Sequence, residues 1–186
     1  MWIEFATVWQ HMGRESGEQS RMSVSVTGSR ISQAVLLLSK LDKEICNNIR
    51  TNEFIDDLQM FENRREQQEF PSLQQKLERA DRKHEIESAE MKQEYFAMLL
   101  LRFRHFPSAQ KLFALFLWRI NDVFESHIIP NVQNLNHSEV EKIVETMIIE
   151  PIIADMGNGF EHFTLTHGHV RGMIYWLADR CFVRWH

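Results

Sequence analysis

The C-terminal part of the sequence gathers residues that can bind a metal ion. Three histidines fall within eight residues, and a cysteine and a last histidine follow: His162, His167, His169, Cys181 and His186. Imidazole nitrogens and thiolates are the usual zinc ligands in proteins. A zinc ion here would support a metal-dependent hydrolase, which we keep as an alternative. The spacing matches no closed zinc site, and ordinary loop and capping histidines explain it more simply, so we predict no metal and no cofactor.

Basic side chains form a second group with chemical meaning. The segment 95–121 contains basic residues and no acidic ones: Arg102, Arg104, Lys111 and Arg119. Such a face can bind phosphate or an acidic partner helix. Cationic side chains also lie along apolar helices with only their charged ends in water, which is the simpler explanation. We name Arg102 and Arg104 as candidate partner-binding residues.

The tail carries three further arginines, Arg171, Arg180 and Arg184. The predicted order of loop, helix and extended end over residues 160–186 is also the order of a winged helix, in which these arginines would contact DNA phosphates. A winged-helix DNA-binding protein is therefore a second alternative. The three arginines are candidate partner-binding residues.

Motifs of the common enzyme classes are missing from the sequence. It has no GxxxxGK[ST] phosphate loop, no GxGxxG, no GxSxG and no CxxC pair. Asp81, Glu90 and Lys92 superficially offer the acids and the lysine of a metal-dependent nuclease, but they fall on a predicted charged helix rather than on paired strands. We expect a protein that is not an enzyme.

The composition favours long helices around a real core. The 186 residues include 13 Phe, 5 Trp and 9 Met against 7 Gly and 4 Pro. The net charge of −5 gives no global attraction for nucleic acid or an acidic membrane. Two distant cysteines suit a reducing compartment, the N-terminus lacks signal-peptide features and no apolar run is long enough to span a membrane. We expect a cytoplasmic protein.

Hydrophobic periodicity divides the chain into two parts. Residues 1–29 are expected to form an N-terminal arm and hinge loop, in which the aromatic side chains of Trp2, Phe5 and Trp9 are available to a partner. Residues 30–186 are expected to form a mainly α, multi-helix bundle.

Within the bundle, the pattern of apolar residues and caps predicts each element. The expected helices cover residues 30–49, 54–61, 72–94 (one long, charged and mostly solvated), 95–106, 109–127 and a stretch from 138. Ser108 is placed to cap the helix over 109–127, whose apolar residues cover most of its circumference and put it in the middle of the bundle. Ser138 and Glu141 form a capping box for the later helix. The segment 160–186 is expected to add a helix and a short terminal strand.

The end of the chain resembles the closing motif, roughly RGxxHxLADxxxVGWHP, of a known family. The matching residues are Arg171, Gly172, Leu177, Ala178, Asp179, Val183, Trp185 and His186. The motif is similar to that of C-terminal domains in bacterial ABC-ATPase three-component conflict systems. Tyr175 stands where that family has His, and Arg184 stands where it has Gly.

The resemblance implies a helical module that ties a nuclease or other effector to an SMC-like ATPase in defence against viruses and plasmids. We expect a stand-alone component or a separately encoded subunit. Gly172 permits close approach of helices, Leu177 and Trp185 are expected to be buried, and Asp179 can bond the following backbone or a nearby arginine. The favoured hypothesis is a non-catalytic adaptor that binds protein subunits, contacts DNA at most through the complex and has no membrane partner.

Overall fold

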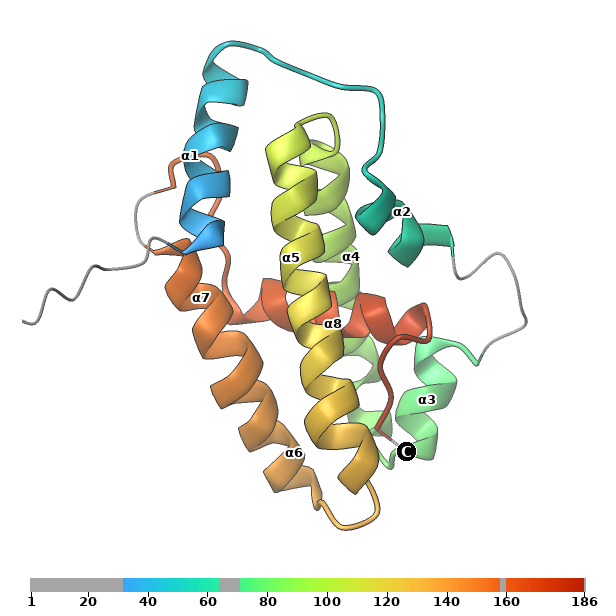
Figure 1. Cartoon of the computed structure of the whole chain (residues 1–186). Coiled ribbons are helices and arrows are strands. Elements are labelled where there is room, and N and C mark those ends of the chain that lie inside the picture. The colour runs from blue at the N-terminus through green and yellow to red at the C-terminus, as the bar shows by residue number, and fades with distance from the viewer. Residues whose placement is uncertain (1–31, 64–70, 158–159, 186) are drawn as a thin grey trace, which may run out of the picture. The chain divides into compact units, whose positions relative to one another are not determined.

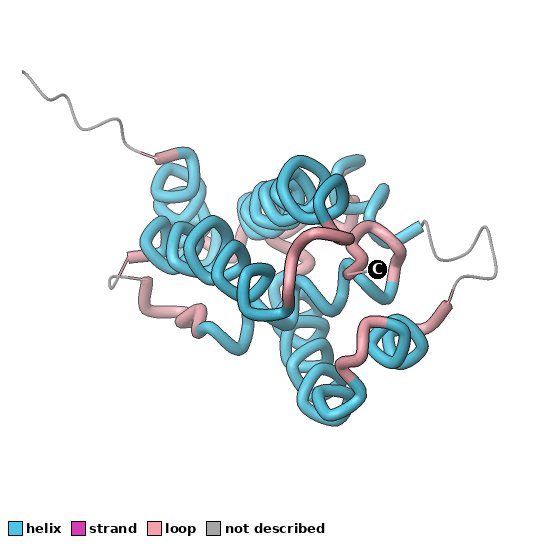
Figure 2. The backbone as a smooth tube through the Cα atoms, turned by 90° about the horizontal axis from the view of Figure 1, so that it is seen from below, coloured by secondary structure: helices cyan, strands magenta, loops and turns pink. Residues whose placement is uncertain are grey.

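Helices form where apolar residues recur every three or four positions. The computed structural model describes residues 32–63, 71–157 and 160–185, which all belong to one compact unit, Ile31–His186. The helices are α1 (Gln33–Cys46), α2 (Asp56–Asn63), α3 (Leu73–Arg79), α4 (Ile86–Phe103), α5 (Pro107–Val123), α6 (His137–Ile143), α7 (Glu150–Met156) and α8 (His167–Asp179). Helices and loops account for all the described residues, with no strand among them (Figure 2). The predicted mainly α class is confirmed, while the predicted arm with Trp2, Phe5 and Trp9 lies outside the described residues.

Helix α5 occupies the centre, as its apolar circumference predicts. Leu112, Phe113, Phe116, Leu117 and Ile120 are each fully buried. Helices α1, α2, α4 and α8 all contact α5 (Figure 1). Each helix that the structure describes is too short or too polar to span a lipid bilayer.

The start of α5 differs from the predicted cap at Ser108. The N–H groups of the first helical turn have no acceptor within the helix, so proline, which has no N–H, loses no hydrogen bond there. Helix α5 begins at such a residue, Pro107. The Ser108 side chain instead donates a hydrogen bond to the Glu44 carboxylate on α1 at 2.6 Å. Ser108 therefore ties two helices together rather than capping one.

Helix α8 runs across α4 and α5 (Figure 1). The crossing with α4 lies at Gly172, where an added Cβ would overlap the carbonyl oxygen of Lys92 and lie 2.9 Å from its carbonyl carbon. The same Cβ would be 3.2 Å from Cβ of Phe96. Only glycine allows the two backbones to approach this closely.

The single charged helix predicted over 72–94 is wrong. The structure has α3, then a turn in which Asp81 has a φ of 57°, then a 3-10 turn Lys83–Glu85 that leads into α4. Two cations of this segment are buried: Lys76 is 3% exposed and Arg82 is 4% exposed. Charge density suggested a solvated helix, but Lys76 turns inward to the carbonyl of the buried Ala178, and Arg82 turns inward to the partly buried Glu85 and Glu141.

The predicted strand at the C-terminus is also wrong. Cys181 adopts a φ of 64°, and the N–H groups of Cys181 and Phe182 donate to the carbonyls of Ala178 and Leu177. These bonds close the end of α8 in the manner of a helix cap. Phe182, Val183 and Trp185 then pack onto the helices in irregular backbone and are buried. Their apolar alternation reflects contact with helices rather than pairing with another strand.

One helical segment runs from His137 to Met156 and widens in the middle. Its capping box is formed by Asn136 and Glu139, so the predicted box at Ser138 and Glu141 is wrong by two residues. A π-helical stretch, Val144–Ile149, comes directly before α7, which has Pro151 in its first turn. Proline has no N–H for the regular helical bond, and the wider turn accommodates it.

Candidate protein-interaction surface

The outer face of α4 exposes large apolar side chains at helical spacing. Met91, Tyr95, Met98 and Leu101 are 48%, 53%, 61% and 60% exposed. They follow one another in steps of four, three and three residues, which keeps them on one side of a helix. We call these four residues the α4 stripe. Contiguous apolar side chains on a surface mark sites of contact with other molecules.

The two ends of the α4 stripe are flanked by exposed residues of opposite charge. Glu87, Glu90 and Glu94 are exposed along the N-terminal part of the helix. Arg102 and Arg104, which the sequence singled out, are exposed at its C-terminal end. A partner helix with the reverse order of charges would be favoured in one orientation, because complementary charge sets register.

The inner face of α4 holds the stripe firmly in place. Buried side chains on that face are Ala89, Phe96, Leu99, Leu100 and Phe103. The Phe96 ring meets Phe113 of α5 and Trp176 of α8 edge-on, with centroid distances of 5.9 and 5.6 Å. Such aromatic pairs add to the free energy of burial and fix orientation. The stripe therefore sits on a rigid support.

A groove lies beside the stripe. It has a volume of 360 Å³, and its lining includes Leu101, Arg104, Glu62, Trp176 and Arg180. The guanidinium carbon of Arg180 lies 3.7 Å from the centroid of the Trp176 ring. Burial raises the pKa of Glu62, and the positive charges of Arg180 and Arg104 oppose that rise. Two predicted partner-binding arginines, Arg104 and Arg180, thus line one groove next to the α4 stripe.

Arg171 lies in a different place, a partly buried charge network between helical segments. Its guanidinium donates to Glu141 at 2.7 Å and to Glu145 at 3.3 Å. Arg82, which sequence reasoning missed, donates twice to Glu85, at 2.9 and 2.8 Å, and once to Glu141, at 2.5 Å. The network joins the segment before α4 to α6 and α8. Charge-assisted bonds of this kind are roughly twice as strong as neutral ones.

The network changes the acidity of its members. Burial alone would raise the pKa of Glu85, but hydrogen bonds and charge from Arg82 outweigh it and hold the pKa below the usual value. Glu141 likewise has a lowered pKa, because bonds and charge from Arg171 and Arg82 exceed the effect of burial. Burial next to Glu85 raises the pKa of Tyr175 to about 12, so its hydroxyl stays protonated and donates to Glu85 at 3.1 Å.

These lowered pKa values predict an acid-sensitive fold. A carboxyl group whose pKa is lower in the folded chain stabilises the fold above its unfolded pKa, here 4.5, and the contribution is lost as pH falls through the folded pKa. We expect Glu141→Gln to flatten the decline of the free energy of unfolding below pH 4.5 by on the order of 1 kcal/mol. Burial raises the pKa of Glu62, but this residue is present in both the wild type and the variant. Its contribution to the pH dependence therefore cancels when the two proteins are compared. Urea unfolding from pH 7 to pH 3 measures this, and equal acid slopes would contradict it.

The motif residues near the C-terminus lie at packing positions. Leu177 is fully buried, and Trp185 is 9% exposed with the Arg82 guanidinium 5.2 Å from its ring centroid. Asp179 is 7% exposed and accepts a hydrogen bond from Gln93 of α4 at 3.2 Å. Arg184 is exposed. The tail therefore fastens α8 to α4 and to the charge network.

The histidines proposed as metal ligands do not come together. His162 contacts Asp42, His167 pairs with Glu145, His169 bonds Thr166 at the start of α8, and Cys181 accepts from the buried Lys76. His186 lies outside the described residues. The ligand set predicted for the hydrolase alternative is therefore not assembled. Residues 160–185, as the structure describes them, contain no strand that could form the wing of a winged helix.

Sequence reasoning missed the α4 stripe, although a signal was present. Met91 falls in the predicted charged helix 72–94, and Tyr95 and Met98 continue from it at helical spacing in the next predicted helix, 95–106. Splitting the predicted charged helix at the turn before Ile86 would have revealed a helix with two apolar faces, one for the core and one exposed.

Comparisons with known proteins bear on the part of the chain that contains this surface. A family model described as C-terminal domain 9 of the ABC-three component (ABC-3C) systems matches residues 72–185. That range includes α4, the charge network and the tail. Searches of curated proteins and of solved structures gave no significant match.

Proposed function

The chain belongs to the family of C-terminal domain 9 of the ABC-three component systems, and from that premise we propose that it is a non-catalytic helical adaptor of a bacterial defence complex. In this proposal the chain binds an SMC-like ABC ATPase and an effector nuclease. The complex works in the cytoplasm, where the ATPase finds ATP, and contacts DNA through its other subunits. Its role is defence against viruses and plasmids.

The observation that carries the proposal is the α4 stripe. Four large apolar side chains stand in water on a helix whose other face is locked into the core. Monomeric proteins rarely leave such surface uncovered, and helix-in-groove recognition uses anchors at this spacing. The family match adds that the system has several components, which supplies protein partners.

The partner surface can be described by its chemistry. Apolar side chains of a partner helix would cover Tyr95 and Met98, which lie at the middle of the α4 stripe. Its acidic residues would face Arg102, and its basic residues would face Glu90. The groove lined by Arg104 would receive an adjoining acidic or apolar side chain. A partner helix with these features is the occupant to which the proposal commits.

Co-expression tests the proposed function. A tagged full-length chain, produced with the other components encoded beside it, should elute with the ATPase component as one stable species on size exclusion. The chain alone should show no ATP hydrolysis and no cleavage of duplex DNA. If the chain co-elutes with none of the other components, the adaptor role is contradicted. Hydrolysis of ATP or DNA by the isolated chain would contradict its non-catalytic character.

A further inference from the structure

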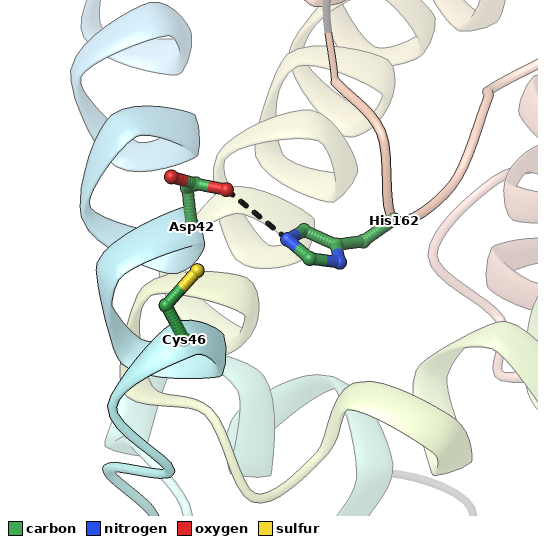
Figure 3. A group of neighbouring side chains, drawn as sticks. All are labelled: Asp42, Cys46 and His162. Atoms are coloured by element: carbon green, nitrogen blue, oxygen red, sulfur yellow. Dashed lines mark hydrogen bonds and ion pairs between the residues drawn. The ribbon is translucent and has the colours of Figure 1, made fainter.

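Three side chains with different donor atoms meet at the side of α1. Asp42 and Cys46 are four residues apart on that helix, and His162 comes from the loop between α7 and α8 (Figure 3). One ligand atom from each lies within 4.8 Å of the other two. His162 Nε2 is 3.1 Å from Asp42 Oδ1. From this geometry we infer that the three residues form a binding site for a divalent transition metal of the zinc class.

The donor set suits that class of ion. Thiolate sulfur, imidazole nitrogen and carboxylate oxygen are the three ligand types that zinc takes in proteins. One thiolate and one carboxylate balance the charge of a divalent cation. Calcium and magnesium prefer oxygen ligands throughout, so the thiol and the imidazole argue against them. Two ligands four residues apart on a helix face the same way, as in helical zinc motifs.

The helix and the loop that carry the three ligands pack on the rest of the fold. The helix α1 is anchored by Leu41, which is fully buried next to Asp42. In the loop, the Phe160 ring lies 5.2 Å from the His162 ring, and Phe163 packs on Phe103 at 4.8 Å. A bound ion therefore requires only small side-chain rotations to draw the donors inward. Preorganised ligands of this kind bind more tightly than ligands on free loops.

The site remains open on one side. The side chains of Asp42 and His162 are 56% and 26% exposed, and Cys46 is exposed. Asp42 and Cys46 also line a surface groove of 610 Å³ together with Met156, Phe160 and Glu161. Three protein ligands leave one position of a tetrahedral zinc ion for water or for a group that enters the groove. A simple ion pair between Asp42 and His162 would not need the third donor.

Cobalt titration of the full-length chain, stripped of metal and kept reduced, tests the inference. Co²⁺ bound through a thiolate gives a near-ultraviolet charge-transfer band, so one equivalent should produce that band and Zn²⁺ should abolish it. Cys46→Ser should remove the band, whereas Cys181→Ser, the matched control at the other cysteine, should retain it. Asp42→Asn and His162→Gln should each weaken Zn²⁺ binding at least about tenfold, since even indirect changes to a metal site cost ~10–100-fold.

The four variants keep this test independent of folding and of the proposed function. Their circular dichroism spectra should match the wild type, because Asp42, Cys46 and His162 lie outside the hydrophobic core and a serine at position 181 still offers Lys76 an acceptor. Absence of a stoichiometric band, a band that survives Cys46→Ser, or equal Zn²⁺ affinity in all variants would overturn the site.

Discussion

Replacing Gly172 with alanine should lower the free energy of unfolding by about 3 kcal/mol, at the upper end of the usual cost of overpacking. The new Cβ would overlap the carbonyl oxygen of Lys92, which belongs to the backbone of α4 and cannot rotate away. Alanine gains about 1 kcal/mol over glycine as a helix former, but this gain is smaller than the clash. Helices α4 and α8 would have to separate, and the aromatic contacts of Phe96 would loosen.

Gly168 provides the matched control for this prediction. It lies in the same helix, and a Cβ there would meet only the Thr166 hydroxyl at 3.5 Å, an ordinary contact. Gly168→Ala should therefore leave the stability unchanged or raise it by up to about 0.5 kcal/mol, less than in a helix interior, because Gly168 is the second residue of α8. Urea denaturation or thermal unfolding of the two variants measures the difference, with a drop of about 6–12 °C expected for Gly172→Ala. Equal stabilities of the two variants would show that the close crossing at Gly172 is unimportant.

A double substitution on the α4 stripe should have the largest effect on function. Tyr95→Asp with Met98→Asp places two carboxylates where a partner's apolar side chains are expected, and charge buried without a partner is costly. Central contacts of an interface each account for about 2 kcal/mol or more, so binding should weaken at least about 100-fold. The fold should be unaffected, because surface changes usually alter stability by about 0.5 kcal/mol or less.

Met147→Asp is the control for the stripe. Met147 is an exposed methionine, 37% accessible, in the π-helical segment Val144–Ile149 and not in the α4 stripe. Co-elution with the ATPase component should be lost in the double variant and kept in Met147→Asp. Loss in both variants, or in neither, would contradict docking through the α4 stripe.

The sequence predicts most of this fold because helical periodicity is local. Helix α5 shows the case well: its apolar circumference alone places it at the centre. The errors occur where distant contacts decide. The irregular end of the chain alternates like a strand because Phe182, Val183 and Trp185 pack against helices. Arg82 has one acceptor nearby in sequence, Glu85, but its other acceptor, Glu141, lies 59 residues away, and local patterns do not show that contact.

In the candidate sites too, features set by local sequence were predictable and features set by distant contacts were not. The exposed position of Arg102 and Arg104 was predictable from an apolar helix with basic edges. The ion pairs of the half-buried Arg171 were not predictable, because Glu141 and Glu145 reach it from another helical segment. Closeness in sequence does not predict which histidine has metal-binding neighbours. His162, His167 and His169 are close in the chain, yet His162 contacts Asp42, which is 120 residues away.

Site-specific photocrosslinking tests the central claim, docking through α4, most directly. A photoreactive phenylalanine analogue would replace Met98 in one protein and Met147 in another, each assembled with the other components of the system. We predict a crosslink to a partner subunit from position 98 and none from position 147. A crosslink from position 147 with none from position 98 would contradict the account.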